Sequence, residues 1–199
     1  MTVPTKQSIR QTARALRRSL SEEQQKYAAE KLCKMLESLG LFAEHIKIAF
    51  YLANDGEIDP GLAMQCAVEK GVHCFLPIIP LQGERRLGFG EVNATTSFQP
   101  NRFGIPEPCT EAADIHLAEQ LDWVLVPLVA FDECGSRVGM GGGFYDTTLG
   151  ASAELGPTGK PEVAGLAHEL QKVSTIPSDS WDIPISRIVT ESTAYQCLK

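Results

Sequence analysis

The chain has 199 residues, of which 43% are hydrophobic and 22% are charged, and its formal net charge at pH 7 is −7. These values are ordinary for a soluble globular protein and predict a single domain over residues 1–199. An acidic surface repels phosphate backbones, which argues against nucleic-acid binding. No apolar run approaches the roughly 18 residues of a membrane span, and no apolar block follows the basic amino terminus as it would in a secretory signal. We therefore expect a cytoplasmic protein that does not bind membranes.

Six cysteines and four histidines are scattered along the chain. No Cys-x-x-Cys pair occurs, which favours free thiols in a reducing compartment over disulfides or a zinc site. The histidines match no metal-ligand spacing, so we expect them to have structural roles.

The first 39 residues predict two helices. At about 100° per residue, a helix over 5–20 places an apolar side and a basic side next to each other: Ile9, Ala13, Leu16 and Leu20, then Lys6, Arg10, Arg14 and Arg17. For Arg14, Arg17 and Arg18, a solvated basic face is the simpler expectation. A second helix is expected over 21–39, because Ser21 and Gln24 resemble a capping box and Gly40 suits a helix end.

A β–α–β unit follows. Residues 47–52 predict a strand, 54–56 a polar turn, and 72–77 a second strand. Between them, Asp59 and Pro60 are typical of a helix start, and the helix should end at Gly71. This order predicts a parallel sheet.

Later elements extend the sheet. We expect extended structure over 86–98, with 98–100 and 103–108 as loop, and a short helix over 110–120. The apolar run 123–129 predicts the central strand. A helix is expected over 144–153, and further strands at 163–167 and 188–190. The predicted fold class is α/β, a three-layer α/β/α sandwich with a mainly parallel central sheet.

The segment 131–146 is the most informative, because four of the five residues from 139 to 143 are glycine. Arg137 precedes this bare stretch and Asp146 follows it. Free N–H groups beside a guanidinium suit phosphate, and a nearby carboxylate suits magnesium bound to that phosphate. A flexible turn is the alternative, although Phe144 and Tyr145 are unusual in a linker. The spacing fits neither a dinucleotide fingerprint nor a Walker loop.

The same segment resembles the signature of the 5-formyltetrahydrofolate cyclo-ligase family. That signature has an aspartate, a Gly-x-Arg-Leu-Gly run, a glycine-rich stretch and a Tyr-Asp pair, which here read Asp132, 135–139, 141–143 and Tyr145-Asp146. Further matches occur in the same order over nearly the whole chain: Lys6-x-x-Ile9-Arg10, 54–58, 103–108, 122–127, Asp182 and 189–191.

The resemblance implies an ATP- and magnesium-dependent ligase of one-carbon metabolism. Enzymes of that family close a ring in 5-formyltetrahydrofolate to give 5,10-methenyltetrahydrofolate, with release of ADP and phosphate, through a phosphorylated formyl intermediate. ATP would be a co-substrate and magnesium a cofactor. The partners would be small molecules, reduced folate and ATP, and we expect a monomer.

The family's site residues carry over to the matching positions. Arg137 and Asp146 would be catalytic, and Asp146 and Asp182 would bind magnesium. Leu52, Glu57 and Tyr145 would contact the pterin, with the Glu57 carboxylate on its amino-pyrimidine edge. ATP would contact Lys6, Arg10, Arg137, Val138, Gly139, Met140, Gly141, Gly142, Gly143, Phe144 and Tyr145.

Several assignments have alternatives. Glu57 is also placed to cap the helix near Pro60, Leu52 suits the core, and Asp182 suits a surface loop. Met140, Gly142 and Thr147 stand where relatives often carry basic residues. Arg137 is then the only local cation, so phosphate binding should depend on the amino-terminal helix. Two other functions stay open: a noncatalytic nucleotide- or folate-binding regulator, and an enzyme like the sugar-phosphate isomerases or CoA-transferases.

Overall fold

The computed structural model describes residues 5–80, 83–153, 161–177 and 185–197. Its α-helices are α1 (Lys6–Arg18), α2 (Glu22–Ser38), α3 (Gly61–Glu69) and α4 (Phe144–Ala153). The main sheet contains β1 (Lys47–Ala49), β2 (His73–Ile78), β3 (Gly88–Val92), β6 (Trp123–Pro127), β9 (Glu162–Leu166), β10 (Arg187–Val189) and β11 (Ala194–Gln196). Two smaller hairpins pair β4 (Phe98–Pro100) with β5 (Pro106–Pro108), and β7 (Ala130–Phe131) with β8 (Arg137–Val138).

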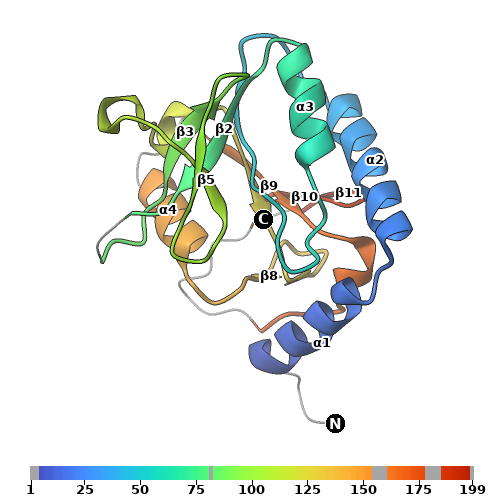
Figure 1. Ribbon diagram of the computed structural model, residues 1–199. Coiled ribbons are helices and arrows are strands. Elements are labelled where there is room, and N and C mark those ends of the chain that lie inside the picture. Colours follow the sequence, from blue (N-terminus) through green and yellow to red (C-terminus); the bar gives the residue numbers. More distant parts are fainter. Residues whose placement is uncertain (1–4, 81–82, 154–160, 178–184, 198–199) are drawn as a thin grey trace.

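The main sheet is mostly parallel, as predicted. Its strand order is β11-β10-β9-β6-β1-β2-β3, which places β6 at the centre. The five inner strands run parallel, whereas the edge strands β3 and β11 run antiparallel to their neighbours. Helices α2 and α3 lie side by side on one face and α4 on the other, so the three-layer α/β arrangement is confirmed (Figure 1).

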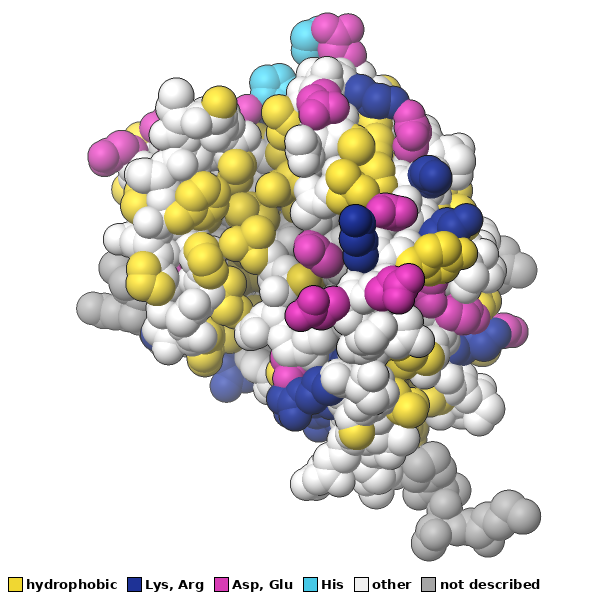
Figure 2. Space-filling model, turned by 45° about the vertical axis from the view of Figure 1, so that its right-hand side comes forward, with side chains coloured by type: hydrophobic (Ala, Val, Ile, Leu, Met, Phe, Trp, Pro, Cys, Tyr) yellow, Lys and Arg dark blue, Asp and Glu magenta, His cyan; other side chains and the backbone are white. Residues whose placement is uncertain are grey.

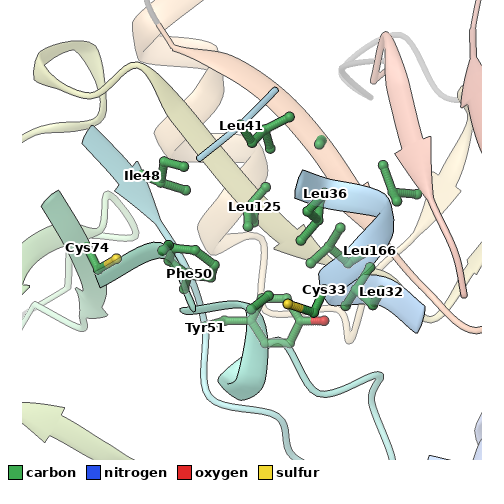
Figure 3. Close-up of a cluster of buried hydrophobic side chains, with 14 of the residues drawn as sticks. Leu32, Cys33, Leu36, Leu41, Ile48, Phe50, Tyr51, Cys74, Leu125 and Leu166 are labelled. Atoms are coloured by element: carbon green, nitrogen blue, oxygen red, sulfur yellow. The ribbon is translucent and has the colours of Figure 1, made fainter. Parts of the chain in front are cut away.

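Successive residues of the inner strands enter different cores, because side chains alternate between the faces of a sheet. Leu125 packs on the side of α2, while its neighbours Val124 and Val126 pack on the opposite side. Figure 3 shows Leu32 and Leu36 of α2 facing strand residues such as Leu125. Two buried faces explain why β6 is apolar along its whole length.

The predicted capping box of α2 is confirmed. The Ser21 hydroxyl accepts from the Gln24 backbone N–H at 3.2 Å, and the Gln24 side chain accepts from the Ser21 N–H at 2.8 Å. Helix α3 begins at Gly61, one residue later than expected, and the Asp59 carboxylate accepts from the Gly61 N–H at 2.8 Å. None of the described helices combines the length and apolar character needed to cross a membrane.

Some sequence-based expectations were wrong. The predicted loop at 98–100 and 103–108 is the β4–β5 hairpin, in which Gln99 lies opposite Glu107. Residues 110–120 form two short 3₁₀ turns, Ala112–Asp114 and Ala118–Gln120, instead of one helix. Strand β1 ends at Ala49, earlier than the expected residue 52, although the Phe50 N–H still donates to the Phe75 carbonyl oxygen at 2.8 Å. Tyr51 and Leu52 then line a cavity.

The faces of α1 also differ from the prediction. Ile9 and Ala13 are buried as expected, but the Leu16 side chain is 44% exposed. Arg17, predicted to be solvated, is fully buried. The amphipathic pattern identified the helix correctly but misplaced its buried side by part of a turn.

The β7–β8 hairpin, which the sequence did not reveal, is organised by the buried Asp132 carboxylate. One oxygen accepts from the N–H groups of Cys134 at 3.1 Å and Ser136 at 3.0 Å, and the other accepts from the Ile176 N–H at 3.0 Å. Gly135 occupies the turn with φ +85°, and a Cβ built on it would lie 2.3 Å from the Ile185 carbonyl oxygen. The hairpin therefore requires glycine at 135.

We expect Gly135→Ala to destabilise the protein by about 3 kcal/mol, from left-handed backbone strain of about 1 kcal/mol and a steric clash of about 1–3 kcal/mol. Gly40→Ala is the matched control, because Gly40 has φ +77° but nothing lies within 4 Å of the position that a Cβ would take there. Gly40→Ala should lower the free energy of unfolding by only about 1 kcal/mol. Urea unfolding would measure both, and equal losses would show that the Ile185 contact is unimportant.

Candidate functional site

A cavity of about 1060 Å³ opens at the carboxyl ends of β1, β2 and β6. Open α/β sheets usually bind ligands at this edge. The cavity brings together nearly all of the predicted site residues: Lys6, Arg10, Leu52, Glu57, Arg137, Val138, Gly139, Met140, Gly141, Gly142, Gly143, Phe144, Tyr145 and Asp146. Asp182 lies outside the described residues. Segments from three parts of the sequence thus converge on one site.

The glycine loop 139–143 lies against the amino-terminal helix. Arg10 Nε donates to the Gly139 carbonyl oxygen at 2.8 Å. Gly141 and Gly143 have φ of +96° and +71°, a conformation that other residues adopt only with strain. Among the described residues, no group accepts a hydrogen bond from the N–H of 139–143. The loop therefore offers unused donors to an anion.

Asp55 joins α1 to the turn after β1. Its carboxylate contacts Arg14 Nε at 2.7 Å, Arg17 Nη2 at 2.9 Å, and the Arg18 guanidinium. Burial alone would raise the pKa of Asp55, but hydrogen bonds from Arg14, Arg18 and Arg17 outweigh it and lower that pKa to about 2. Figure 2 shows basic side chains gathered in the lower part of the molecule, where α1 lies.

Arg17 is the buried member of this group. Its Nε donates to the Asp55 carbonyl oxygen at 2.8 Å, and its Nη1 donates to the Leu128 carbonyl oxygen at 3.3 Å. Its Nη2 also lies 3.6 Å from Glu57 Oε1. The prediction of a solvated basic face is therefore wrong for Arg17, because the backbone turn at 55 and the chain after β6 supply acceptors that the sequence of α1 cannot reveal.

Glu57 lines the cavity, and its side chain is 10% exposed. Its Oε2 accepts from the Asn54 N–H at 3.1 Å. No described bond joins Glu57 to α3, whose start is held by Asp59, so the helix-cap alternative is not supported. Burial raises the pKa of Glu57, although Arg17 and the Asn54 N–H oppose that effect. Burial and the nearby Glu57 carboxylate raise the pKa of Tyr145. Leu52 lines the same cavity and also packs on the core.

Arg137 and Asp146, predicted as separate catalytic groups, pair with each other at 2.5 Å between Nη2 and Oδ1. The Asp146 side chain is 47% exposed, and its Oδ2 accepts no hydrogen bond from a described group. No cluster of three histidine, cysteine or acidic residues suited to a metal occurs in the described ranges. That finding is compatible with magnesium, which usually binds one or two carboxylates together with substrate phosphates and waters.

The β4–β5 hairpin forms a wall of the cavity, a role that the sequence does not indicate. Glu107 Oε1 accepts from the Ile79 N–H at 2.9 Å and from Asn101 Nδ2 at 2.8 Å. Phe103 meets Phe144 edge to face, with ring centroids 6.3 Å apart. The motif 103–108 marked this segment, but the bond from the Ile79 N–H to Glu107 joins residues that lie 28 positions apart in the sequence.

The comparisons with known proteins agree with one another. The family model described as 5-formyltetrahydrofolate cyclo-ligase family matches residues 2–191. The chain is 34% identical over 188 residues to a 5-formyltetrahydrofolate cyclo-ligase of Escherichia coli, covering 94% of this chain and 99% of that protein. It is 32% identical to the Haemophilus influenzae protein of the same name, covering 95% and 99% of the two chains.

Solved structures give the same result. The structure of Aquifex aeolicus 5,10-methenyltetrahydrofolate synthetase superimposes with a TM-score of 0.80 at 30% identity, covering 98% of this chain and 93% of that one. A Mycoplasma pneumoniae protein of the same name shares the fold, with a TM-score of 0.70. Fold and sequence together define an α/β enzyme of the ligase class. The chain belongs to the 5-formyltetrahydrofolate cyclo-ligase family.

The three arginines around Asp55 predict a pH-dependent contribution to stability. The pKa of Asp55 is about 2, against an ordinary 3.8, a difference worth about 2 kcal/mol at neutral pH. Asp55→Asn should lose that amount at pH 7. Because the folded-state pKa of Asp55 is depressed, the difference in free energy of unfolding between wild type and Asp55→Asn should narrow as the pH falls from about 4 towards 2. Urea unfolding at several pH values would measure it.

Glu30→Gln is the control, because Glu30 is exposed and forms no ion pair with a described residue. It should change stability little at any pH. A gap between wild type and Asp55→Asn that stays constant with pH would contradict the role of the ionised carboxylate.

Proposed function

We propose that this protein uses ATP and magnesium to convert 5-formyltetrahydrofolate to 5,10-methenyltetrahydrofolate. One observation supports the proposal above others: a single cavity contains a set of groups suited to phosphate and a set suited to the pterin. The first set is the glycine loop with Lys6 and Arg10, and the second is Glu57, Leu52 and Tyr145. A cavity of about 1060 Å³ is large enough for two substrates side by side.

The chemistry requires activation of a poor leaving group. The formyl oxygen attacks the γ-phosphorus of ATP, and ADP leaves. The adjacent amine nitrogen, N10, then attacks the formyl carbon, loses its proton and expels phosphate, which closes the ring. Phosphoryl transfer of this kind depends mainly on alignment and charge neutralisation rather than on a protein nucleophile.

The chain's residues fit these tasks. The N–H groups of 139–143 and the guanidinium of Arg10 neutralise phosphate charge, and Arg137 adds a third source of positive charge at the loop. The half-buried ring of Tyr145 and the Leu52 side chain border the place for the pterin, and the Glu57 carboxylate accepts from its paired N–H donors. The β4–β5 hairpin limits the access of water on one side.

Asp146 is the residue that would hold magnesium. Its exposed carboxylate has one oxygen on Arg137 and one directed to no described partner. When bound, the ion would neutralise negative charge on the triphosphate. The pairing with Arg137 keeps Asp146 in place and also holds the guanidinium at the loop.

The test is a direct assay with ATP, magnesium and 5-formyltetrahydrofolate, followed by the absorbance of the methenyl product. Wild type should form product only when all three are present. Asp146→Asn keeps the size of the side chain but loses the charge that a hard cation needs. It should therefore lose nearly all turnover while remaining folded, as far-UV circular dichroism would show. No product from folded wild type would overturn the proposal, and full activity of Asp146→Asn at limiting magnesium would overturn the ligand role.

A second prediction separates pterin recognition from phosphate chemistry. Glu57→Gln replaces one acceptor oxygen by an NH₂ group that faces the donors of the pterin, so folate affinity should fall by at least about tenfold. The affinity for ATP should not change. Calorimetric titration with each substrate would measure both.

Asp59→Ala is the matched control, because it removes the carboxylate that holds the start of α3. It should reduce stability and leave folate affinity within about twofold, well under 1.4 kcal/mol. If folate binds Glu57→Gln as tightly as wild type, the placement of the pterin is wrong.

A further inference from the structure

The sequence pointed to a weakness in the glycine loop, because Met140, Gly142 and Thr147 are uncharged where relatives often carry cations. The structure shows a guanidinium arriving at the same loop from another part of the chain. A Cβ built on Gly143 would lie 3.3 Å from Arg85 Nη1 and 3.9 Å from Arg85 Cδ. Arg85 also lines the cavity.

The backbone on the carboxyl side of Arg85 is well anchored. The Leu87 N–H donates to Thr148 Oγ1 of α4 at 2.9 Å, and Arg86 Nη2 contacts both carboxylate oxygens of Glu119 at 2.7 and 2.8 Å. These bonds tie the connection between β2 and β3 to α4 and the segment before β6. These bonds fix the backbone next to Arg85 near the glycine loop, although the Arg85 side chain itself is exposed.

Arg85 differs from the other guanidinium groups at the loop. Arg137 is paired with Asp146, and Arg10 Nε is bonded to the Gly139 carbonyl. Arg85 forms no hydrogen bond or ion pair with any residue in the described ranges. Its five N–H donors are thus available beside the unused backbone N–H groups of 139–143.

Two glycines of one loop are each approached by an arginine. Arg10 Nη2 lies 4.0 Å from the position that a Cβ would take on Gly141, and Arg85 Nη1 lies 3.3 Å from the corresponding position on Gly143. The two arginines come from α1 and from the β2–β3 connection, so they reach the loop from different elements. A phosphate chain lying on the loop would meet both.

We infer that Arg85 is a further phosphate-binding residue of this site, which supplies from the β2–β3 connection the cation that the loop itself lacks. This inference rests on the proposed function, because it takes the anion to be the polyphosphate of ATP. A guanidinium suits that ligand because its planar fork donates two parallel hydrogen bonds to phosphate oxygens. The carboxylates of a folate glutamyl tail are the other anions that this cation could meet, and the test separates them.

The experiment is calorimetric titration of Arg85→Gln, Arg85→Lys and wild type with ATP and magnesium in the absence of folate. Arg85→Gln should raise the Kd for ATP by about five- to tenfold, the size expected for one partly solvated charged hydrogen bond. Arg85→Lys should recover part of the loss, because it keeps the charge but not the fork. The Kd for inorganic tripolyphosphate should rise in the same order, from wild type through Arg85→Lys to Arg85→Gln. The Kd for adenosine should be the same for all three proteins.

Lys34→Gln is the matched control, since Lys34 is exposed on α2 and does not line the cavity. It removes one positive charge and should leave the Kd for ATP within about twofold, well under 1.4 kcal/mol. All variants should bind monoglutamyl 5-formyltetrahydrofolate like wild type.

Three results would overturn the inference. If wild type binds ATP and Arg85→Gln binds it equally well, Arg85 is only a solvated side chain, and the proposed function is unaffected. If Arg85→Gln instead weakens only folate that carries a poly-γ-glutamyl tail, the residue serves carboxylates. If folded wild type does not bind ATP at all, the inference and the proposed function fail together.

Discussion

The buried guanidinium of Arg17 is the constraint on which the arrangement of the site depends. A charged group is removed from water only at high cost unless its donors are paired. Arg17 meets this requirement with the carboxylate and carbonyl of Asp55 and the carbonyl of Leu128. Helix α1, the turn after β1 and the chain after β6 are thereby held in one geometry, and separating any of them would leave a buried charge unpaired.

Arg17 also determines how its neighbours ionise. It opposes the effect of burial on Glu57, whose pKa would otherwise rise further. His168 is buried close to the same guanidinium, and its pKa falls to about 4 because of burial first and then repulsion by Arg17. A hydrogen bond with the Gly56 backbone works in the opposite direction but is outweighed. A neutral histidine therefore packs beneath the turn without adding a second positive charge.

The cavity brings together two kinds of chemistry. Backbone N–H groups and guanidinium groups at the glycine loop create a positive environment that is only partly offset by Asp146. The buried Glu57 carboxylate is bordered by tyrosine and aliphatic side chains. Arg17 connects the two groups, because its Nη2 lies 3.6 Å from Glu57 Oε1 and 3.6 Å from Met140 Sδ of the loop.

The sequence by itself determined the fold class, the central position of 123–129 and the capping box of α2. These features follow from local patterns: apolar runs, turn residues and short-range hydrogen bonds. Several separated motifs also identified the family, and most of the residues chosen from them line one cavity. Their individual roles remain predictions, as does that of Asp182.

Only the tertiary structure decided which basic residues are buried and which reach the loop. Arg17 and Arg18 are neighbours in the sequence, yet Arg17 is fully buried and the Arg18 side chain is 55% exposed. The sequence around Arg85 does not indicate a binding site, because Arg85 and Gly143 are nearly sixty residues apart in the sequence and only folding brings them together. The β4–β5 hairpin is likewise attached to the rest of the chain by a bond that joins distant residues, since the Ile79 N–H donates to the Glu107 carboxylate at 2.9 Å. Helical periodicity describes one element at a time, whereas the burial of a charge depends on partners that folding brings to it.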